Sequence, residues 1–574
     1  MKAQREKDLW KIWTEKALED QDVQRELKDM AFDEEKIYDS FYRDLEFGTG
    51  GLRGVIGAGT NRMNIYTVAK ATQGYANYLK KRQEKPSAAI AYDSRIKSDL
   101  FARVAAGVLA ANGIKVFIYR QLMPTPSLSY AVRFLKCSGG IVITASHNPA
   151  KYNGYKVYGA DGGQITSAAA SEILGEINGL DTFRDVKKMD FEEGVKTGIV
   201  EYIDDSVITS YIQAVSGEAL CGSEVDKSVS IVYTPLNGAG LSCVLRALKE
   251  NGFSNISVVK EQEQPDGNFP TCPYPNPEIR EAMELGIKYA KEQGSDLLLA
   301  TDPDCDRVGI AVRKGEEYCL LNGNEVGVLL LDYICKRRLE KGLMPERPLM
   351  VKTIVTTDMA KKIAGYYGVE VIEVLTGFKY IGEQIGLLEQ KGEENRYIIG
   401  FEESYGYLTG GFVRDKDAVN GSLMICEMFA YYKSRGKNLI EVLEELYDRF
   451  GYCLTSLHSY QFEGEAGFHK MQDFMKKMRA ESPLALGGLK TLAVEDYKEQ
   501  IRHYQGGHKE SITGFPVSDV LKFLLEGESS CVVRPSGTEP KLKLYLSVTG
   551  DDRQKAAEQE EKIVKDIEEL LNRD

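Results

Sequence analysis

Three aspartates alternate along the segment TDPDCDR, at Asp302, Asp304 and Asp306, directly after the apolar run LLLA. If this segment is extended, side chains two residues apart point to the same side, so the three carboxylates converge. Converging carboxylates repel one another unless a cation lies among them, and oxygen-only ligands favour Mg²⁺. An EF-hand is excluded because arginines stand where its loop needs glycine and glutamate. The segment predicts a site for one Mg²⁺ per chain, with a solvated acidic turn as the alternative.

A serine follows a second apolar run in the stretch IVITASHNPAKYNGYK. Ser146 does not lie in a G-x-S-x-G context, so it lacks the nucleophile elbow of the hydrolases. Adjacent side chains of an extended chain point in opposite directions, so a dyad of Ser146 and His147 is not assumed. A serine at such a place often caps a helix. Lys156 and the aspartate segment nevertheless favour a chemical role for Ser146.

The segment GFEESYGY carries Glu402, Glu403 and Ser404 after the apolar run YIIG. Carboxylate and hydroxyl groups together are suited to hydrogen bonds with the hydroxyls of a sugar. A helix N-cap explains the same residues nearly as well.

The segment RPSGTEPKLKLY places Arg534, Ser536, Gly537 and Thr538 around a tight turn. Such a turn presents backbone N–H groups and a guanidinium to a phosphate. A surface turn with an incidental arginine is an equal alternative.

Two further segments carry weaker signals. FGTGGLRG contains Arg53 where the dinucleotide-binding pattern needs a third glycine, and it lacks the lysine and hydroxyl that end a P-loop. A glycine turn that directs Arg53 at an anion and a plain structural turn both explain it. TGFKY brings Lys379 to the end of a predicted strand, where a solvated lysine is the ordinary interpretation.

The elements that must position these residues alternate between β-branched runs and helical patterns. This alternation predicts mostly parallel sheets covered by helices, whose ligands bind beyond the carboxyl ends of the strands. The pattern recurs three times, and the tail instead indicates an antiparallel α+β domain. A chain of 574 residues is also too long for one core. We therefore predict four domains: 1–205 with N-terminal helices and Ser146, 206–320 with the metal site, 321–450 with the GFEESYGY segment, and 451–574 with the RPSGTEPKLKLY segment.

Composition narrows the function classes. The formal net charge of −13 argues against a general nucleic-acid binder, which needs basic surfaces. The ten cysteines form no CxxC pair, which argues against zinc and is typical of a reducing compartment. The charged N-terminus does not resemble a signal peptide, and no apolar run reaches the ~20 residues of a membrane span. We expect a cytoplasmic protein without nucleic-acid or membrane partners.

Four motifs in order, T-A-S-H-N-P, D-P-D-x-D-R, G-F-E-E-S and R-P-S-G-T-E-P, resemble the α-D-phosphohexomutase superfamily. The similarity covers about residues 41–550 and is closest to the phosphoglucomutase branch, which includes phosphopentomutase-type members. It implies three related α/β domains with mixed, mostly parallel sheets and a C-terminal α+β domain around a central cleft.

The resemblance also implies roles for individual residues. Ser146 would be phosphorylated, and its phosphate would complete the Mg²⁺ ligands supplied by the three aspartates. Arg307 would lie near the phosphoserine, Glu402 and Ser404 would bind the sugar, and the RPSGTEPKLKLY turn would hold the phosphate that is not transferred. The residues that would line the cleft are Arg53, His147, Lys156 and Lys379. Of these, His147 and Lys379 are the candidates for the general base.

The implied activity is a Mg²⁺-dependent isomerase that interconverts glucose 1-phosphate and glucose 6-phosphate through a phosphoserine and a glucose 1,6-bisphosphate intermediate, which also serves as activator. Glu403 favours glucose, because the mannose-active branch usually has methionine there. Phosphopentomutase, phosphomannomutase and glucose 1,6-bisphosphate synthase remain alternatives. The functions of a phosphatase or of a sugar-phosphate binding protein would account for fewer of the motifs. The sequence predicts no oligomeric state.

Overall fold

The computed structural model describes residues 2–48, 50–462, 464–535 and 541–572. The chain divides into two compact units. The first contains residues 1–322, 381–397 and 404–435, and the second contains residues 323–380, 398–403 and 436–574.

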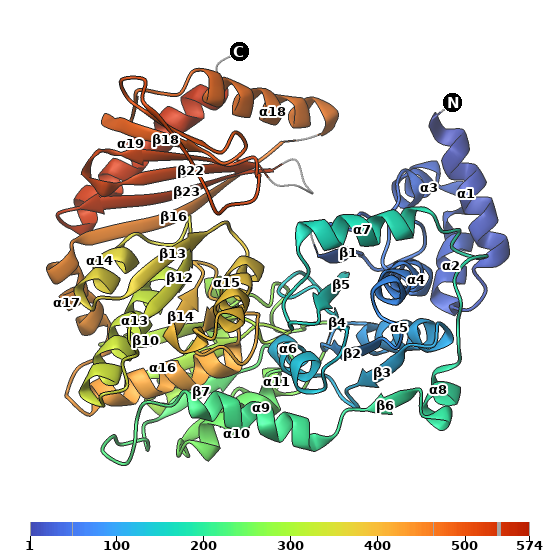
Figure 1. The fold of residues 1–574 in the computed structure, drawn as a ribbon, viewed down its shortest axis with the longest axis horizontal. Coiled ribbons are helices and arrows are strands. Elements are labelled where there is room, and N and C mark those ends of the chain that lie inside the picture. The colour runs from blue at the N-terminus through green and yellow to red at the C-terminus, as the bar shows by residue number, and fades with distance from the viewer. Residues whose placement is uncertain (1, 49, 463, 536–540, 573–574) are drawn as a thin grey trace. The chain divides into compact units, whose positions relative to one another are not determined.

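The first unit begins with short helices followed by a six-stranded sheet (Figure 1). The N-terminal helices are α1 (Lys2–Lys16), α2 (Gln21–Asp29), η1 (Met30–Phe32) and α3 (Glu34–Phe41). The strands are β1 (Gly51–Val55), β2 (Ser87–Tyr92), β3 (Lys115–Ile118), β4 (Gly139–Ile143), β5 (Tyr152–Gly159) and β6 (Val200–Tyr202), in the order β1-β5-β4-β2-β3-β6. The pairs β2–β3, β2–β4 and β3–β6 are parallel, whereas β5 is antiparallel to β4 and β1.

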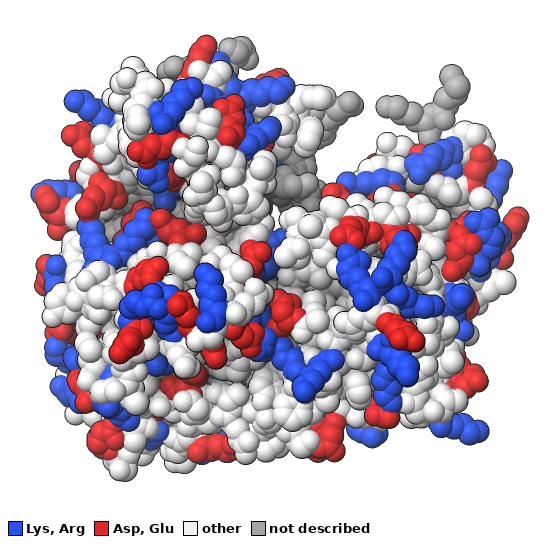
Figure 2. Space-filling view, viewed as in Figure 1, with Lys and Arg blue, Asp and Glu red and all other residues white. Residues whose placement is uncertain are grey.

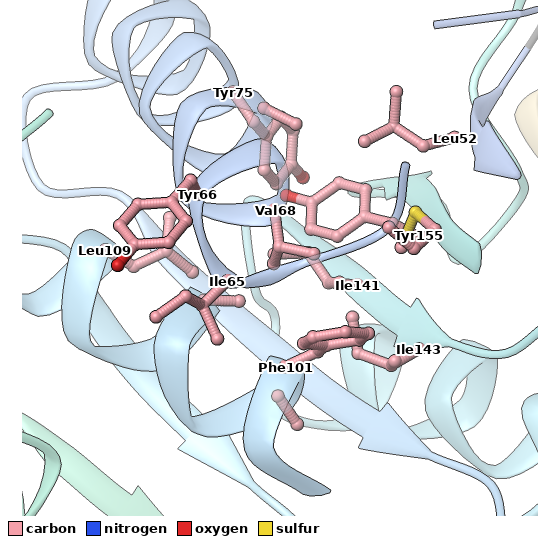
Figure 3. Close-up of a cluster of buried hydrophobic side chains, with 14 of the residues drawn as sticks. Leu52, Ile65, Tyr66, Val68, Tyr75, Phe101, Leu109, Ile141, Ile143 and Tyr155 are labelled. Carbon is pink, nitrogen blue, oxygen red and sulfur yellow. The ribbon is translucent and has the colours of Figure 1, made fainter. Parts of the chain in front are cut away.

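Five helices accompany this sheet, namely α4 (Ile65–Arg82), α5 (Ser98–Ala111), α6 (Thr125–Phe134), α7 (Ser167–Asn178) and α8 (Phe191–Thr197). Asn64 caps α4 through its side-chain oxygen, which accepts from the backbone N–H groups of Tyr66 and Thr67. Apolar side chains of α4 and α5 meet those of β4 and β5 in one core, as Figure 3 shows for Val68, Phe101, Ile141 and Tyr155.

A second sheet of the first unit has the strand order β11-β10-β9-β7-β8. Its strands are β7 (Ile231–Thr234), β8 (Ile256–Val258), β9 (Leu297–Thr301), β10 (Val308–Lys314) and β11 (Glu317–Leu321). Its helices are α9 (Asp205–Gly217), α10 (Leu241–Glu250), α11 (Lys260–Glu263) and α12 (Arg280–Gln293). β7 is parallel to β8 and β9, whereas β10 folds back antiparallel on β9 through the aspartate segment.

The second unit opens with α13 (Gly323–Glu340), β12 (Leu349–Thr353), α14 (Met359–Tyr366) and β13 (Glu370–Val374). β12 pairs in parallel with β13, and its other neighbour is β14 (Tyr397–Phe401). Of the elements that follow in the chain, η2 (Glu394–Arg396), β15 (Tyr407–Leu408), α16 (Ala418–Lys433) and most of α15 (Phe378–Gln390) belong to the first unit, and α17 (Leu439–Phe450) belongs to the second.

The tail of the chain is an antiparallel sheet with helices, as expected for an α+β domain. Its elements are β16 (Tyr452–Gln461), α18 (Gly464–Ala480), β17 (Ala485–Leu486), β18 (Leu489–Asp496), β19 (Ile501–Tyr504), β20 (Lys509–Ser511), β21 (Leu521–Leu525), η3 (Glu526–Glu528), β22 (Ser530–Pro535), β23 (Lys541–Gly550) and α19 (Arg553–Asn572). Apolar residues of α18, α19 and the strands form its core. The predicted fold class, mixed α/β sheets with a C-terminal α+β domain, is confirmed.

Acidic and basic side chains are intermingled on the face shown in Figure 2. Among the described helices, none is both long and apolar enough to cross a bilayer.

Candidate active site

The turn after β4 gives Ser146 an unusual backbone conformation. Its φ angle is 51°, in the left-handed region that non-glycine residues rarely adopt. The Thr144 Oγ1 atom stabilises the turn by accepting from the Ser146 N–H at 2.8 Å. Because the chain is not extended here, Ser146 Oγ lies 3.2 Å from Nδ1 of the adjacent His147. The expectation that these two side chains point apart is therefore wrong.

Arg95, in the loop after β2, binds residues 144–151, the loop between β4 and β5 that carries Ser146 and is called the serine loop. Its guanidinium donates to four backbone carbonyls, those of Ser146, Asn148, Pro149 and Tyr152. The guanidinium Nε lies 3.4 Å from an Asp93 carboxylate oxygen, and both side chains are fully buried. Sequence reasoning missed Arg95, although the segment YDSR follows an apolar run like the other chemistry-bearing segments do.

The aspartate segment between β9 and β10 is a tight turn, not an extended strand. Cys305 has a φ angle of 52°, and Asp302 Oδ1 accepts from the N–H groups of Asp306 and Arg307 at 3.1 and 3.0 Å. The argument that the segment is extended is therefore wrong, but the three carboxylates do converge as predicted. One carboxylate oxygen from each aspartate lies within 4.8 Å of the others, and all three residues are buried.

Two neighbouring segments fix this turn. In the loop after β7, Ala239 N donates to Pro303 O at 2.8 Å, and a Cβ on Gly238 would lie 2.5 Å from Pro303 Cα. At the start of α6, Thr125 donates from its backbone N–H to Asp304 O at 2.8 Å and from its hydroxyl to Asp304 Oδ2 at 3.0 Å.

The serine loop and the aspartate turn meet. Ser146 Oγ donates to Asp302 Oδ2 at 2.8 Å. Lys156 on β5 places its Nζ 2.9 Å from Asp304 Oδ2 and 3.5 Å from Asp306 Oδ2. Burial lowers the pKa of Lys156, but the two carboxylates more than offset this and raise it overall, so Lys156 is a cation.

A second lysine at the aspartates was not anticipated from the sequence. Lys416 Nζ lies 2.8 Å from Asp306 Oδ2. The segment GGFVRDKD that carries it combines glycines with alternating charges, a signal that could have singled it out. Arg414 of the same segment anchors the loop, because its backbone N–H donates to Ser129 Oγ at 2.9 Å and its guanidinium pairs with Glu389 at 2.7 Å.

The pKa values of Asp302 and Asp304 shift in opposite directions. Burial, reinforced by the charges of Asp304 and Asp306, raises the pKa of Asp302 well above its ordinary value. Burial opposes ionisation of Asp304 as well, but Lys156 and Lys416 lower the pKa of that carboxyl below its ordinary value.

The donor set suits a hard divalent cation. Asp304 Oδ1 and Asp306 Oδ1 are buried and accept no hydrogen bond from the described part of the chain. Buried carboxylate oxygens without donors are costly, and a cation bound by oxygen ligands satisfies them. The residues present therefore fit Mg²⁺.

His147, Arg53 and Arg307 complete this cluster in the first unit. Burial, together with the charges of Arg307 and Arg53, lowers the pKa of His147 well below its ordinary value. This shift favours the neutral imidazole over the imidazolium. Arg53 on β1 donates to Asn148 Oδ1 at 3.4 Å, and the Arg307 guanidinium pairs with Glu278.

The predicted sugar and phosphate residues lie elsewhere in the chain. Glu402 Oε1 accepts from Gly377 N at 3.0 Å, and Glu403 Oε2 lies 3.4 and 3.5 Å from the hydroxyls of Thr353 and Thr356. The ammonium of Lys379 lies 5.1 Å from the centre of the Tyr380 ring. These residues and Arg534 belong to the second unit, whereas Ser404 belongs to the first. Ser536, Gly537 and Thr538 lie outside the described residues.

The chain matches four family domains. They are described as phosphoglucomutase/phosphomannomutase alpha/beta/alpha domain I (residues 44–183), domain II (209–315) and domain III (322–450), and as the C-terminal domain (487–565). A Staphylococcus haemolyticus protein named phosphoglucomutase is 38% identical over 514 residues, which cover 89% of this chain and 92% of the relative.

The chain belongs to the phosphoglucomutase/phosphomannomutase family. A putative phosphomannomutase from Thermus thermophilus has the same fold, with a TM-score of 0.67, 24% identity and coverage of 92% of this chain and 99% of that one. An Aspergillus fumigatus N-acetylphosphoglucosamine mutase, solved with GlcNAc-6P and magnesium, has a TM-score of 0.51, 14% identity and coverage of 92% and 96%.

Membership of the phosphoglucomutase/phosphomannomutase family confirms the predicted resemblance and the enzyme class, a phosphohexomutase that acts as an isomerase. The structure brings Ser146 to the three aspartates, with Lys156, His147, Arg53 and Arg307 around them. The roles that the family resemblance assigns to these residues, and to those of the second unit, stay predictions.

Proposed function

We propose that this family member is a magnesium-dependent phosphoglucomutase in which Ser146 carries the transferred phosphoryl group. The observation that supports it best is the 2.8 Å contact between Ser146 Oγ and Asp302, which places the hydroxyl at the edge of the predicted metal site. Relatives named phosphoglucomutase, similar over nine-tenths of the chain, support glucose phosphate as the substrate.

The surroundings of Ser146 are suited to a phosphoserine. Such a group carries about −1.5 to −2 charges at neutral pH and needs cations and donors around it. Lys156 supplies a cation, and Arg307 can exchange its partner Glu278 for a phosphate oxygen. When bound, the divalent cation would neutralise further negative charge as the phosphoryl group transfers. Positioning and charge stabilisation supply most of the catalysis in this kind of reaction.

The reaction then has two halves. A free sugar hydroxyl attacks the phosphorus of phosphoserine 146, and its proton leaves to a base. The bond from phosphorus to Ser146 Oγ breaks, and Ser146 Oγ takes up a proton. The resulting glucose 1,6-bisphosphate then reorients end over end, so that its other phosphoryl group faces Ser146. Ser146 Oγ then loses its proton and attacks the other phosphoryl group. The bond from that phosphorus to the sugar oxygen breaks, and the released sugar oxygen takes up a proton.

Proton transfer at Ser146 has two candidate acceptors. Asp302 Oδ2 and His147 both lie within hydrogen-bond distance of Ser146 Oγ. We propose that His147 receives the serine proton, because its Nδ1 atom lies 3.2 Å from Ser146 Oγ. Lys379 remains the candidate base for the sugar hydroxyl.

The remaining assignments follow the family pattern. Glu402 and Ser404 would bind sugar hydroxyls, Arg53 would face the substrate, and Arg534 with Ser536, Gly537 and Thr538 would hold the other phosphate. Glucose 1,6-bisphosphate would act as activator. The protein would need no nucleic acid or membrane and would act in the cytoplasm.

A substrate panel tests this proposal. The purified protein is assayed with Mg²⁺ and glucose 1,6-bisphosphate on the 1-phosphates of glucose, mannose and ribose, while free phosphate is also measured. We expect the highest kcat/KM for glucose 1-phosphate and no stoichiometric phosphate release. Equal or faster turnover of ribose 1-phosphate would instead make the protein a phosphopentomutase, and phosphate release without isomer would indicate a phosphatase.

A further inference from the structure

The N-terminal helices lie before the residues that match family domain I, yet they form part of its core. The match begins at residue 44. Trp13, Leu27 and Phe41 are nevertheless buried in the same cluster as Tyr66 and Ile141. The rings of Trp13 and Tyr66 pack edge to face with centroids 5.5 Å apart. The extension is therefore fixed to the domain that carries Ser146.

Helix α2 reaches the loop after β2 through an ion-pair cluster. Lys97 Nζ lies 2.9 and 3.2 Å from the two carboxylate oxygens of Asp20, and 3.0 Å from Asp22 Oδ2. Asp20 also caps α2 by accepting from the N–H groups of Asp22 and Val23. Lys97 itself has a φ angle of 63°. A lysine in this left-handed region persists only where its surroundings hold it.

The loop from Asp93 to Lys97 links this ion pair to Ser146. Asp93 accepts from the Arg95 N–H at 2.9 Å and from the Ser98 hydroxyl at 2.7 Å. Asn153 at the start of β5 donates to Ile96 O at 3.0 Å. Arg95 lies between these anchors and holds the carbonyls of the serine loop. Lys97 therefore lies two positions after Arg95 in one anchored loop.

A second contact of α2 supports the other side of the same loop. Glu26 Oε2 accepts from Ala58 N at 2.8 Å, just beyond β1, and a Cβ on Gly57 would lie 2.9 Å from that oxygen. The N–H of Ile56, next along the chain, donates to Lys151 O at 2.9 Å. Lys151 is the last residue of the serine loop before β5. Helix α2 and its cap thus contact two segments, the Asp93–Lys97 loop and the segment after β1, and each of these segments hydrogen bonds to the serine loop.

We propose that helix α2 is a positioning element for the serine loop, and that the ion pair of Asp20 and Asp22 with Lys97 fixes the loop in which Arg95 holds Ser146. Asp20, Asp22 and Lys97 are positioning residues, because they contact neither the aspartate turn nor Ser146. This inference rests on the proposed role of Ser146 as phosphoryl carrier. It extends that function to a segment outside the matched domain.

The test compares Lys97→Met with Lys188→Met in the full chain. Lys188 also pairs with the N-terminal residues that precede the matched domain, because its Nζ lies 2.7 Å from Glu19 Oε1. This ion pair does not involve a residue of the Asp93–Lys97 loop. Methionine keeps the length of the side chain and makes no new demand on the φ angle. We expect kcat for glucose 1-phosphate to fall about tenfold in Lys97→Met, with KM within about twofold, because misplacement of a reacting group acts on the chemical step. Lys188→Met should retain the kcat of the unmodified chain.

Two further variants separate positioning from general stability. Lys97→Arg preserves the ion pair and should restore most of kcat. The double variant Asp20→Asn with Asp22→Asn removes the carboxylates but keeps a side-chain oxygen that can cap α2, and it should reproduce the loss seen in Lys97→Met. The rate at which glucose 1,6-bisphosphate phosphorylates Ser146, followed by intact mass, should fall by the same factor as kcat.

The outcomes are distinguishable. If the unmodified chain shows no isomerase activity, the proposed function is wrong. If the unmodified chain is active but Lys97→Met matches Lys188→Met in kcat, only the positioning inference is overturned. A rise in KM at constant kcat, or failure of Lys97→Arg to restore activity, also overturns it. Should Lys97→Met not fold, the aspartate double variant decides by the same criteria.

Discussion

At the scale of single residues, the site combines three buried carboxyl groups with two lysines. Asp302, Asp304 and Asp306 are all buried, and the ammonium groups of Lys156 and Lys416 lie within 3 Å of two of them. Asp304 Oδ1 and Asp306 Oδ1 still accept no hydrogen bond within the described residues. This arrangement explains why a divalent cation should bind here and why it should be needed for activity.

Asp306→Asn tests that expectation. It removes one negative ligand, so the Mg²⁺ concentration for half-maximal isomerase activity should rise by about tenfold or more. The measurement is a titration of Mg²⁺ into chelator-treated protein, with bound Mn²⁺ counted by electron paramagnetic resonance as a readout independent of turnover. An unchanged requirement for Mg²⁺ would show that the aspartate turn is not the metal site.

At the scale of elements, the site depends on turns that the sequence pattern does not reveal. The sequence correctly places Ser146 and the aspartates just beyond buried strands, because β4 and β9 are long apolar runs. It does not reveal the positive φ angles of Ser146 and Cys305, because residues other than glycine rarely adopt them. Local patterns also cannot show that Arg95 and Lys416 lie beside the serine loop and the aspartate turn, because these contacts join segments far apart in sequence.

Gly238→Ala tests the support of the aspartate turn. The added Cβ would lie 2.5 Å from Pro303 Cα, so the turn or the loop after β7 must move. We expect the free energy of unfolding to fall by about 1–3 kcal/mol, together with a higher Mg²⁺ requirement, both measured against Gly217→Ala. Gly217 ends α9 with no atom within 4 Å of an added Cβ. Equal behaviour of the two variants would show that the close approach at Gly238 does not matter.

The N-cap of α16 predicts a pH dependence of stability. Asp417 is buried and accepts from Val419 N, Asn420 N and the Tyr211 hydroxyl. Burial raises its pKa from 3.8 to about 7, with a small contribution from Asp415. Between these two values the folded state holds a proton that the unfolded state has lost, so this carboxyl lowers the stability of the fold as pH rises.

Asp417→Asn removes that titration but keeps an oxygen for the cap. The free energy of unfolding of Asp417→Asn minus that of the unmodified protein should therefore increase from pH 5 to pH 8, as measured by urea unfolding. Asp204→Asn is the matched control, because Asp204 caps α9 and hydrogen bonds lower its pKa. Its stability difference from the unmodified protein should stay constant over the same range. A constant difference for Asp417→Asn would contradict the raised pKa.

At the scale of the whole molecule, the phosphoryl carrier and the predicted phosphate loop belong to different compact units. Within the second unit, the C-terminal domain packs on the preceding one. Lys522 on β21 donates to Ile354 O at 3.1 Å and lies 3.7 Å from Glu373. An apolar cluster joins the same regions through Val355, Leu375, Tyr497, Val520 and Tyr545. If the C-terminal domain moves while the bisphosphate reorients, these contacts must break or shift.

The most direct test of the whole account follows the phosphoryl group itself. The protein is incubated with glucose 1,6-bisphosphate labelled with ³²P, the labelled peptide is mapped, and unlabelled glucose 1-phosphate is then added. The account predicts label on Ser146 that passes into the glucose bisphosphate and monophosphate pool, and neither label nor turnover in Ser146→Ala. Label on another residue, or turnover by Ser146→Ala, would contradict it.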